Sequence, residues 1–215
     1  MLAHSRAKSM KFLIGKKQHM TQVFGEDGRV YPATIVKVGP VVVTQIKQGE
    51  KEGYQAVQVG FGSRKESNIT KSLKGHSKGH GNFSGFREFR MDGGEVTVKP
   101  GDSIDVSVFN PGDEVTIIST SKGKGFQGAV KRHGFGGGRR SHGQKHSERE
   151  VGSIGGGGRA GGRVAKGMRM AGRMGGDRVT LHHVKVLQIN KEGNELLLHG
   201  SVPGRPGTII EISSK

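Results

Sequence analysis

Short runs of Val, Ile and Thr, separated by turn-forming residues, recur along most of this chain and restrict it to a β-rich fold. Examples are "YPATIVKV", "VVVTQIK", "YQAVQVGF" and "EVTIIS", with "GEDG", "QGEKEG" and "NPGD" between such runs. β-branched residues favour strands, whereas Gly, Pro, Asp and Asn favour turns. Almost no segment has the length and periodicity of a helix. We therefore predict a mainly β fold, built as a small β-barrel.

The β pattern stops near residue 119 and resumes near residue 179 with "RVTLHHVKVLQI". The intervening basic window, residues 121–178, holds 19 of the 39 glycines of the chain. It also holds 14 Lys and Arg against 3 Asp and Glu. Since strand patterns stand on both sides, we predict a glycine- and arginine-rich basic extension inserted between strands of the barrel.

This interruption sets the expected domain organisation. Residues 10–120 and 179–215 form the barrel body, and the polar, basic stretch 62–85 is expected to be an irregular loop. Residues 1–9 are expected to be an N-terminal leader without order. The apolar stretch near the N-terminus is too short for a secretory signal.

The charge of the chain indicates a polyanionic partner. Its formal net charge is +17 and its pI about 10.4, which makes nucleic acid the first candidate and a membrane surface the second. No amphipathic helix or run of about 20 apolar residues favours the membrane. The absence of cysteine excludes disulfides, thiolate chemistry and cysteine-bound zinc.

A glycine motif follows the run "EVTIIS", where Gly123, Gly125 and Gly128 give the spacing GxGxxG. A dinucleotide site needs this motif to open a helix that leads to a second parallel strand. Here glycine interrupts any helix after two turns at most, and "RSHGQKHSERE" is unsuited to a buried strand. The acid at about the expected distance, Glu148, is then a coincidence, and we reject a nucleotide cofactor.

Two explanations of the basic window remain, a disordered linker and a segment that packs against a partner. The window has no Asp or Glu between residues 121 and 147, and Met168, Met170 and Met174 alternate with cations. Glycine follows an irregular groove, and Arg clamps phosphate. The pattern favours a segment that enters folded RNA and becomes ordered there.

Other chemistry has little support in the sequence. His142 and His146 have a spacing that suits two metal ligands on a helix, but Gly143 disfavours a helix and the local positive charge repels cations. No nucleophile, base or pair of carboxylates stands out. We therefore predict a protein that is not an enzyme and has no metal, cofactor or small-molecule substrate.

Several stretches resemble a known family, and they occur in the same order along the chain. They include "GKKQHMTQVFGEDG", "TSKGKGFQGAVKRHGF", "GSIG", "GRVAKGMRMAGRMGGDRVT" and "LLLHGSVPGRPG". Together they resemble the third protein of the large ribosomal subunit, in its bacterial form. The likeness runs from about residue 10 to the C-terminus, and several of the strings are specific on their own.

The resemblance implies a β-barrel of the type found in translation proteins, in a cytoplasmic structural constituent of the large ribosomal subunit. It implies binding to 23S-type rRNA, nucleation of early subunit assembly, and extension of the basic window toward the peptidyl transferase centre. Implied partners are the rRNA and the fourteenth and nineteenth large-subunit proteins, with no membrane. The alternative is a free chaperone that binds RNA without specificity.

The residues expected to bind rRNA are the cations and histidines of the basic window, together with its tip. The predicted rRNA contacts are Lys122, Lys124, Lys131, Arg132, His133, Arg139, Arg140, His142, Lys145, Arg149, Arg159, Arg163, Lys166, Arg169, Arg173 and Arg178. The tip expected near the peptidyl transferase centre is Gly152, Ser153, Ile154, Gly155, Gly156, Gly157, Gly158 and Arg159.

Overall fold

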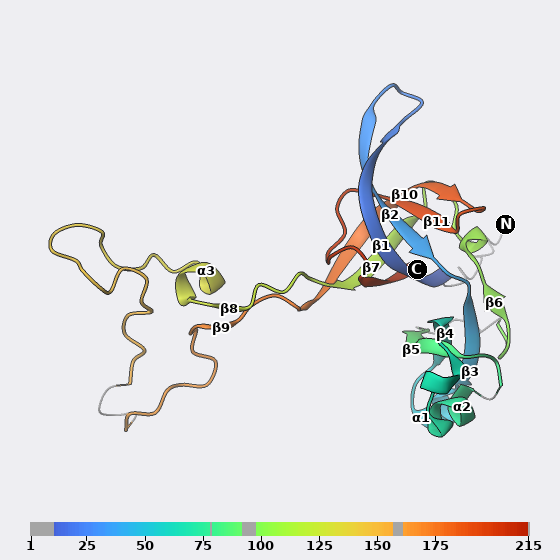
Figure 1. Cartoon of the computed structure of the whole chain (residues 1–215), viewed down its shortest axis with the longest axis horizontal. Coiled ribbons are helices and arrows are strands. Elements are labelled where there is room, and N and C mark those ends of the chain that lie inside the picture. The colour runs from blue at the N-terminus through green and yellow to red at the C-terminus, as the bar shows by residue number, and fades with distance from the viewer. Residues whose placement is uncertain (1–10, 78, 92–97, 157–160, 215) are drawn as a thin grey trace, which may run out of the picture. The chain divides into compact units, whose positions relative to one another are not determined.

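The computed structural model describes residues 11–77, 79–91, 98–156 and 161–214 (Figure 1). The expected leader and three tip residues, Gly157, Gly158 and Arg159, lie outside the described residues. The chain forms two compact units, which we call the body, residues 1–120 and 178–215, and the extension, residues 121–177.

Six antiparallel strands close into a barrel in the body, so the predicted mainly β fold with a barrel is confirmed. Side chains that alternate along each strand fill its interior, such as Val115 and Ile117 on one strand and Ile210 and Ile212 on its neighbour, all at most 1% exposed. In barrel order the strands are β1 (Lys11–Phe24), β12 (Ile209–Ser214), β7 (Glu114–Thr120), β10 (Arg178–Asn190), β11 (Glu195–His199) and β2 (Val30–Val38).

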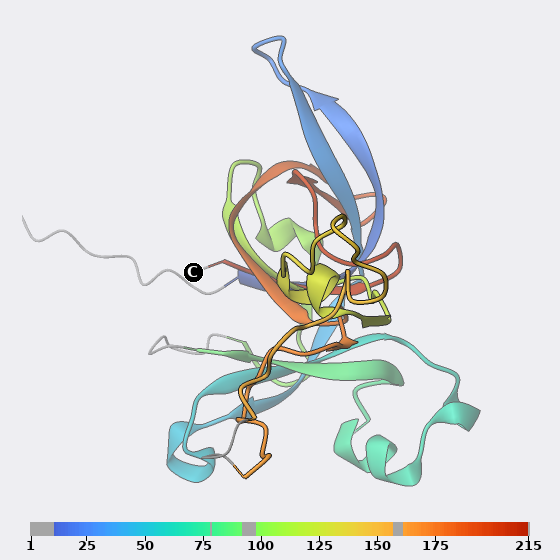
Figure 2. The same ribbon diagram turned by 90° about the vertical axis from the view of Figure 1, so that its left-hand side faces the viewer.

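Strands β1 and β2 continue beyond the barrel as a two-stranded hairpin, which both views show (Figures 1 and 2). The pairing of β1 with β12 covers only Lys11 to Lys16, whereas its pairing with β2 reaches Phe24. The part of the hairpin beyond the barrel therefore has no further strand on its β1 edge among the described residues.

A second, four-stranded sheet packs into the same core as the barrel. The ring of Phe12 in β1 stacks on Phe89 of this sheet, with centroids 4.6 Å apart. The residues from Ala56 to Phe61 are all buried, including the polar Gln58, so both faces of this strand are covered. The sheet has the order β5 (Phe83–Arg90), β4 (Ala56–Ser63), β3 (Val41–Lys47) and β6 (Ser103–Ile104), with α1 (Gly49–Glu52) between β3 and β4.

The expectation of an irregular loop over 62–85 is wrong for most of that stretch. It contains η1 (Glu66–Asn68), α2 (Lys71–Ser77) and the start of β5. The backbone N–H of Leu73 donates to the Thr70 hydroxyl at 3.4 Å, as at a capped helix start. His76 then contacts the Gln58 side-chain oxygen at 2.8 Å and packs edge-on against Phe86. A second short 3₁₀ turn, η2 (Val106–Val108), follows β6.

The extension begins and ends at neighbouring points of the barrel wall. Strands β7 and β10 pair directly, and Thr120 stands opposite Arg178 in their ladder. The inserted segment therefore leaves and rejoins the barrel at one paired position of this ladder. Its own elements are β8 (Phe126–Gln127), α3 (Ala129–His133) and β9 (Gly172–Arg173).

Candidate nucleic-acid interface

The two arms of the extension pair with each other in a stem, residues 121–127 and 172–177. The N–H of Lys124 donates to the Met174 carbonyl, and the N–H of Met174 to the Gly125 carbonyl, both at 2.9 Å. The N–H of Ser121 donates to the Asp177 carbonyl at 2.8 Å, and β8 pairs with β9. The basic segment is thus a hydrogen-bonded ribbon where it starts and not a structureless linker.

One turn of helix follows the stem. Two of its side chains, both among the predicted rRNA contacts, contact a carbonyl within the extension. Helix α3 begins after Gly128 and ends at Gly134, whose φ is 73°. Arg132 donates from Nη1 to the Met170 carbonyl at 2.8 Å, and the ring of His133 contacts the same oxygen at 3.1 Å. Both side chains are half-buried, so they hold the two arms of the extension together.

The glycine motif has no nucleotide-binding geometry in the described part of the chain. Gly123 and Gly125 lie in the stem, and Gly128 precedes a helix of only five residues. The strand before the motif, β7, pairs antiparallel with β10, and β8 pairs antiparallel with β9, so the described residues provide no parallel strand of a dinucleotide fold after the motif.

Glu148 closes a loop rather than facing a ribose. Its carbonyl accepts a hydrogen bond from the N–H of Gly138 at 2.9 Å, and its carboxylate lies 2.7 Å from Nε of Arg140. A β-carbon at Gly138 would approach the Ser147 carbonyl oxygen to 2.8 Å, so this close approach of two backbones favours glycine.

Most of the predicted rRNA contacts point their charge at solvent. The described acids of the extension are Glu148, Glu150 and Asp177, of which Glu148 is already paired. The exposed predicted contacts are Lys122, Lys124, Lys131, Arg139, Arg140, His142, Lys145, Arg149, Arg163, Lys166, Arg169 and Arg173 in the extension, and Arg178 in the body.

The described part of the predicted tip is a bent, mainly exposed backbone. Gly152 and Gly155 have φ values of 78° and 71°, which a side chain would disfavour. The N–H of Gly155 lies 3.4 Å from the Ser153 hydroxyl, and Ile154 is half-buried. Gly156 is exposed. Such a chain can follow a narrow, irregular surface.

Clear pKa shifts occur on the second sheet of the body, at a charge pair. The ammonium of Lys47 lies 2.7 Å from the Glu88 carboxylate and 2.7 Å from the Tyr54 hydroxyl. The hydrogen bond from Lys47 lowers the pKa of Glu88, and the bonds to Glu88 and Tyr54 raise the pKa of Lys47. Both shifts favour the charged forms, so this pair stabilises structure and is unsuited to proton transfer.

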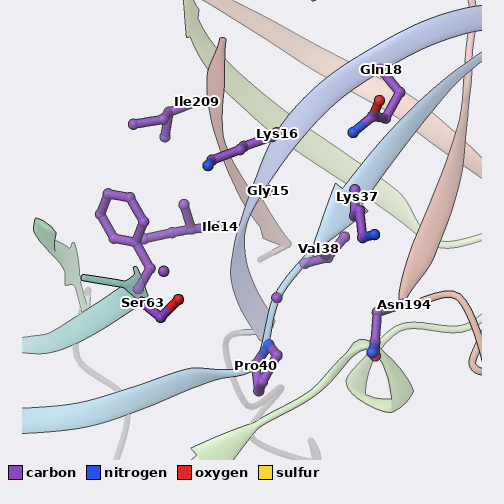
Figure 3. A pocket seen from close by; sticks show the side chains of 13 residues that line it. Ile14, Gly15, Lys16, Gln18, Lys37, Val38, Pro40, Ser63, Asn194 and Ile209 are labelled. Carbon is purple, nitrogen blue, oxygen red and sulfur yellow. The ribbon is translucent and has the colours of Figure 1, made fainter. Parts of the chain in front are cut away.

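A pocket of about 380 Å³ lies on the body beside β1 and β2 (Figure 3). Its lining is mainly apolar, including Ile14 and Val38, and the polar side chains of Lys16, Gln18, Lys37, Ser63 and Asn194 also line it. No carboxylate or histidine of the described residues lines it.

The described residues contain no cluster of three or more His, Asp or Glu that could hold a metal ion. Within that same part of the chain, no helix has the length and apolar character needed to cross a membrane.

Comparison with known proteins identifies the chain. The family model described as "Ribosomal protein L3" matches residues 93–208. A large ribosomal subunit protein uL3 of Herpetosiphon aurantiacus is 44% identical over 201 residues, which cover 94% of each chain. That of Finegoldia magna is 43% identical, covering 94% of this chain and 97% of its own. That of Chlorobium limicola is 40% identical, covering 95% and 99%.

The barrel with its inserted basic ribbon, together with these matches, defines a ribosomal protein of the large subunit. The chain belongs to the ribosomal protein L3 family. The family predicted from the sequence is therefore confirmed. Members of this family are structural constituents of the large ribosomal subunit, a cytoplasmic particle in bacteria, and not enzymes.

Proposed function

We propose that the chain binds 23S-type rRNA mainly through the extension, nucleates early assembly of the large subunit, and carries its tip toward the peptidyl transferase centre. The observation that supports this most is the stem, which holds a ribbon of exposed cations with few acids among them. Lys and Arg displace counterions from phosphates, and this release favours binding. The half-buried Arg132 and His133 contribute by fixing the shape of the ribbon.

Charge-matched variants test the binding. The extension variant carries Arg163→Gln, Lys166→Gln and Arg169→Gln, which are all exposed. The body variant removes the same charge through the exposed residues Lys51, Lys65 and Lys71, each changed to Gln. Affinity for 23S-type rRNA is measured against salt concentration by filter binding.

We expect the extension variant to lose about 2–3 units of the slope of log affinity against log salt, since each phosphate contributes about 0.7–0.9. The body variant should lose less. Equal losses in both variants, and equal affinity for an unrelated RNA of the same length, would support the free nonspecific chaperone instead.

A photo-reactive amino acid at Ile154 tests the location of the tip. Ile154 lies in the described part of the predicted tip. In assembled large subunits, we expect cross-links to rRNA of the peptidyl transferase centre. Cross-links confined to rRNA at the subunit surface would contradict this part of the proposal.

We also propose that the body contacts the fourteenth and nineteenth proteins of the large subunit, as the family resemblance implies. Protein cross-linking of purified subunits followed by mass spectrometry should join body lysines to these two proteins.

Omission of the chain from a reconstitution of the large subunit tests the nucleation role. Assembly should then stop at an early particle, whereas a late arrest would refute that role.

A further inference from the structure

A hollow of about 560 Å³ on the body brings together three arginines from separate parts of the sequence. Arg87 belongs to β5, Arg178 begins β10, and Arg205 lies between β11 and β12. Thr208 and Glu211 are also among its lining residues. We call this site the arginine hollow, and all of its lining residues belong to the body.

One carboxylate orients two of these arginines. Nε of Arg87 lies 2.8 Å from one oxygen of Glu211, and Nη2 of Arg178 lies 3.8 Å from the other. The Glu211 side chain is only 20% exposed, whereas those of Arg87 and Arg178 are 49% and 70% exposed. The carboxylate is therefore the sheltered group, and the guanidinium groups remain open to solvent.

The guanidinium groups keep donors that protein atoms do not use. Arg87 also donates from Nη1 to the Phe86 carbonyl at 3.1 Å. A guanidinium carries five N–H donors, so this leaves part of Arg87 and most of Arg178 free for another acceptor. Arg205 is exposed, and its side chain has no hydrogen bond or ion pair within the described residues.

The charges of the hollow do not balance. Three arginines and one carboxylate line it, and no other acidic side chain among the described residues does. The lining therefore carries a net positive charge, which attracts an anion. Phosphate suits the site because its oxygens accept paired hydrogen bonds from the planar guanidinium fork. An ordinary solvated ion pair would account for Arg87 and Glu211, but it leaves the position of Arg205 unexplained.

We propose that the arginine hollow binds a phosphodiester group of the rRNA, as a second contact separate from the extension. This inference rests on the proposed function, because it takes rRNA as the ligand. It adds Arg87 and Arg205 to the rRNA-binding residues and gives Glu211 a positioning role. The hollow lies where the chain leaves and re-enters the barrel, since Thr120 and Arg178 both line it.

The test compares the double variant Arg87→Gln and Arg205→Gln with a control that removes the same charge elsewhere. The control is Arg29→Gln with Arg64→Gln, two exposed arginines of the body outside the hollow. Arg29 faces Asp27 at 3.6 Å, so it matches the paired character of Arg87. The full chain and 23S-type rRNA are used throughout, and thermal unfolding checks that each variant is folded.

We expect the hollow variant to bind about eightfold more weakly in 0.1 M salt and to lose about 0.9 of the salt slope, as for one phosphate contact. The single variant Arg205→Gln leaves the Arg87–Glu211 pair intact and should still show a loss of several fold. Arg205→Lys keeps the charge, so it should keep the slope while it loses affinity. Losses equal to those of the control would overturn the inference.

Two further arms separate the possible outcomes. The extension variant described above is measured in parallel. If it loses affinity and the hollow variants do not, the proposed function stands and the hollow inference fails. If the hollow variants lose affinity and the extension variant does not, the proposal for the extension fails and the hollow inference stands. Pyrophosphate is then titrated without RNA. If pyrophosphate binding depends on Arg205 while the Arg205 variants keep their affinity for RNA, the hollow binds a free anion, and the proposal that it binds an rRNA phosphodiester is overturned.

Discussion

Replacement of Gly175 by Ala should open the stem of the extension while the barrel stays folded. Gly175 has a φ of 74°, and a β-carbon there would collide with the Lys122 carbonyl oxygen. It would also stand 3.1 Å from Cα of Gly123 and from N of Lys124. All three are backbone atoms, which cannot move aside as the end of a flexible side chain can.

The expected cost is comparable to what holds the stem closed. A left-handed conformation costs Ala about 1–2 kcal/mol, before any collision is counted. The hydrogen bonds between the arms, such as that from Lys124 to Met174 at 2.9 Å, contribute about 1 kcal/mol each. A loss of about 2 kcal/mol of local stability raises the equilibrium constant for opening of the stem roughly 30-fold.

Amide hydrogen exchange measures this opening directly. The amides of Ser121, Lys124 and Met174 should exchange about 30-fold faster in Gly175→Ala. Amides of the barrel, such as that of Ile117, should not change. The control is Gly123→Ala, because no atom lies within 4 Å of its β-carbon position and its φ is not positive. Unchanged exchange at the three stem amides of Gly175→Ala would refute the reasoning.

Three further changes should have separable effects. Leu198→Ala empties part of the barrel core, where Leu198 is fully buried, and should lower the free energy of unfolding in urea by about 2–5 kcal/mol. Glu88, whose pKa is lowered from 4.5 by its hydrogen bond to Lys47, should stabilise the body at neutral pH. That contribution should disappear as the pH falls below 4.5, so the stability difference between the protein and Glu88→Gln should shrink in acid. Arg132→Met removes one of the two side-chain contacts to the Met170 carbonyl and should speed proteolysis of the extension without a change in the melting temperature of the barrel.

The barrel could be predicted because its strands carry their own signals. In "EVTIIS", buried Val115 and Ile117 alternate with more exposed residues, as a strand with one buried face requires. The insertion was predictable for the same reason, since a strand pattern resumes at residue 179 and the structure starts β10 at Arg178. Local sequence suffices where burial alternates along one strand.

Helix α2 could not be found in this way, because its support comes from distant residues. It is seven residues long, contains Gly75, and buries only Ser77, so it has no apolar stripe. What fixes it is the contact of His76 with Gln58 and Phe86, which belong to two strands of the second sheet. Thr70 was the one local signal, as a residue suited to cap a helix.

For the candidate site, the sequence predicts which residue types are present but not how their side chains are arranged in space. Sequence shows that the basic window is cationic, but not that Arg132 and His133 both turn inward to a carbonyl 37 or more residues away. The arginine hollow was also hidden, because Arg87, Arg178 and Arg205 meet only after three segments of the barrel body have folded together.

The direct pairing of Thr120 with Arg178 has a consequence for how the length of the extension can vary. Folding of the barrel brings the two ends of the inserted segment together and so closes it into a loop. For its 57 residues, the conformational entropy lost on loop closure costs about 3–4 kcal/mol. This cost grows only with the logarithm of the length, so a segment twice as long would add about 0.6 kcal/mol. The barrel can therefore accept insertions, deletions and changes of composition in the extension at nearly constant stability. The distance that such a ribbon reaches from the barrel can therefore change while the paired strands β7 and β10 that hold its ends stay the same.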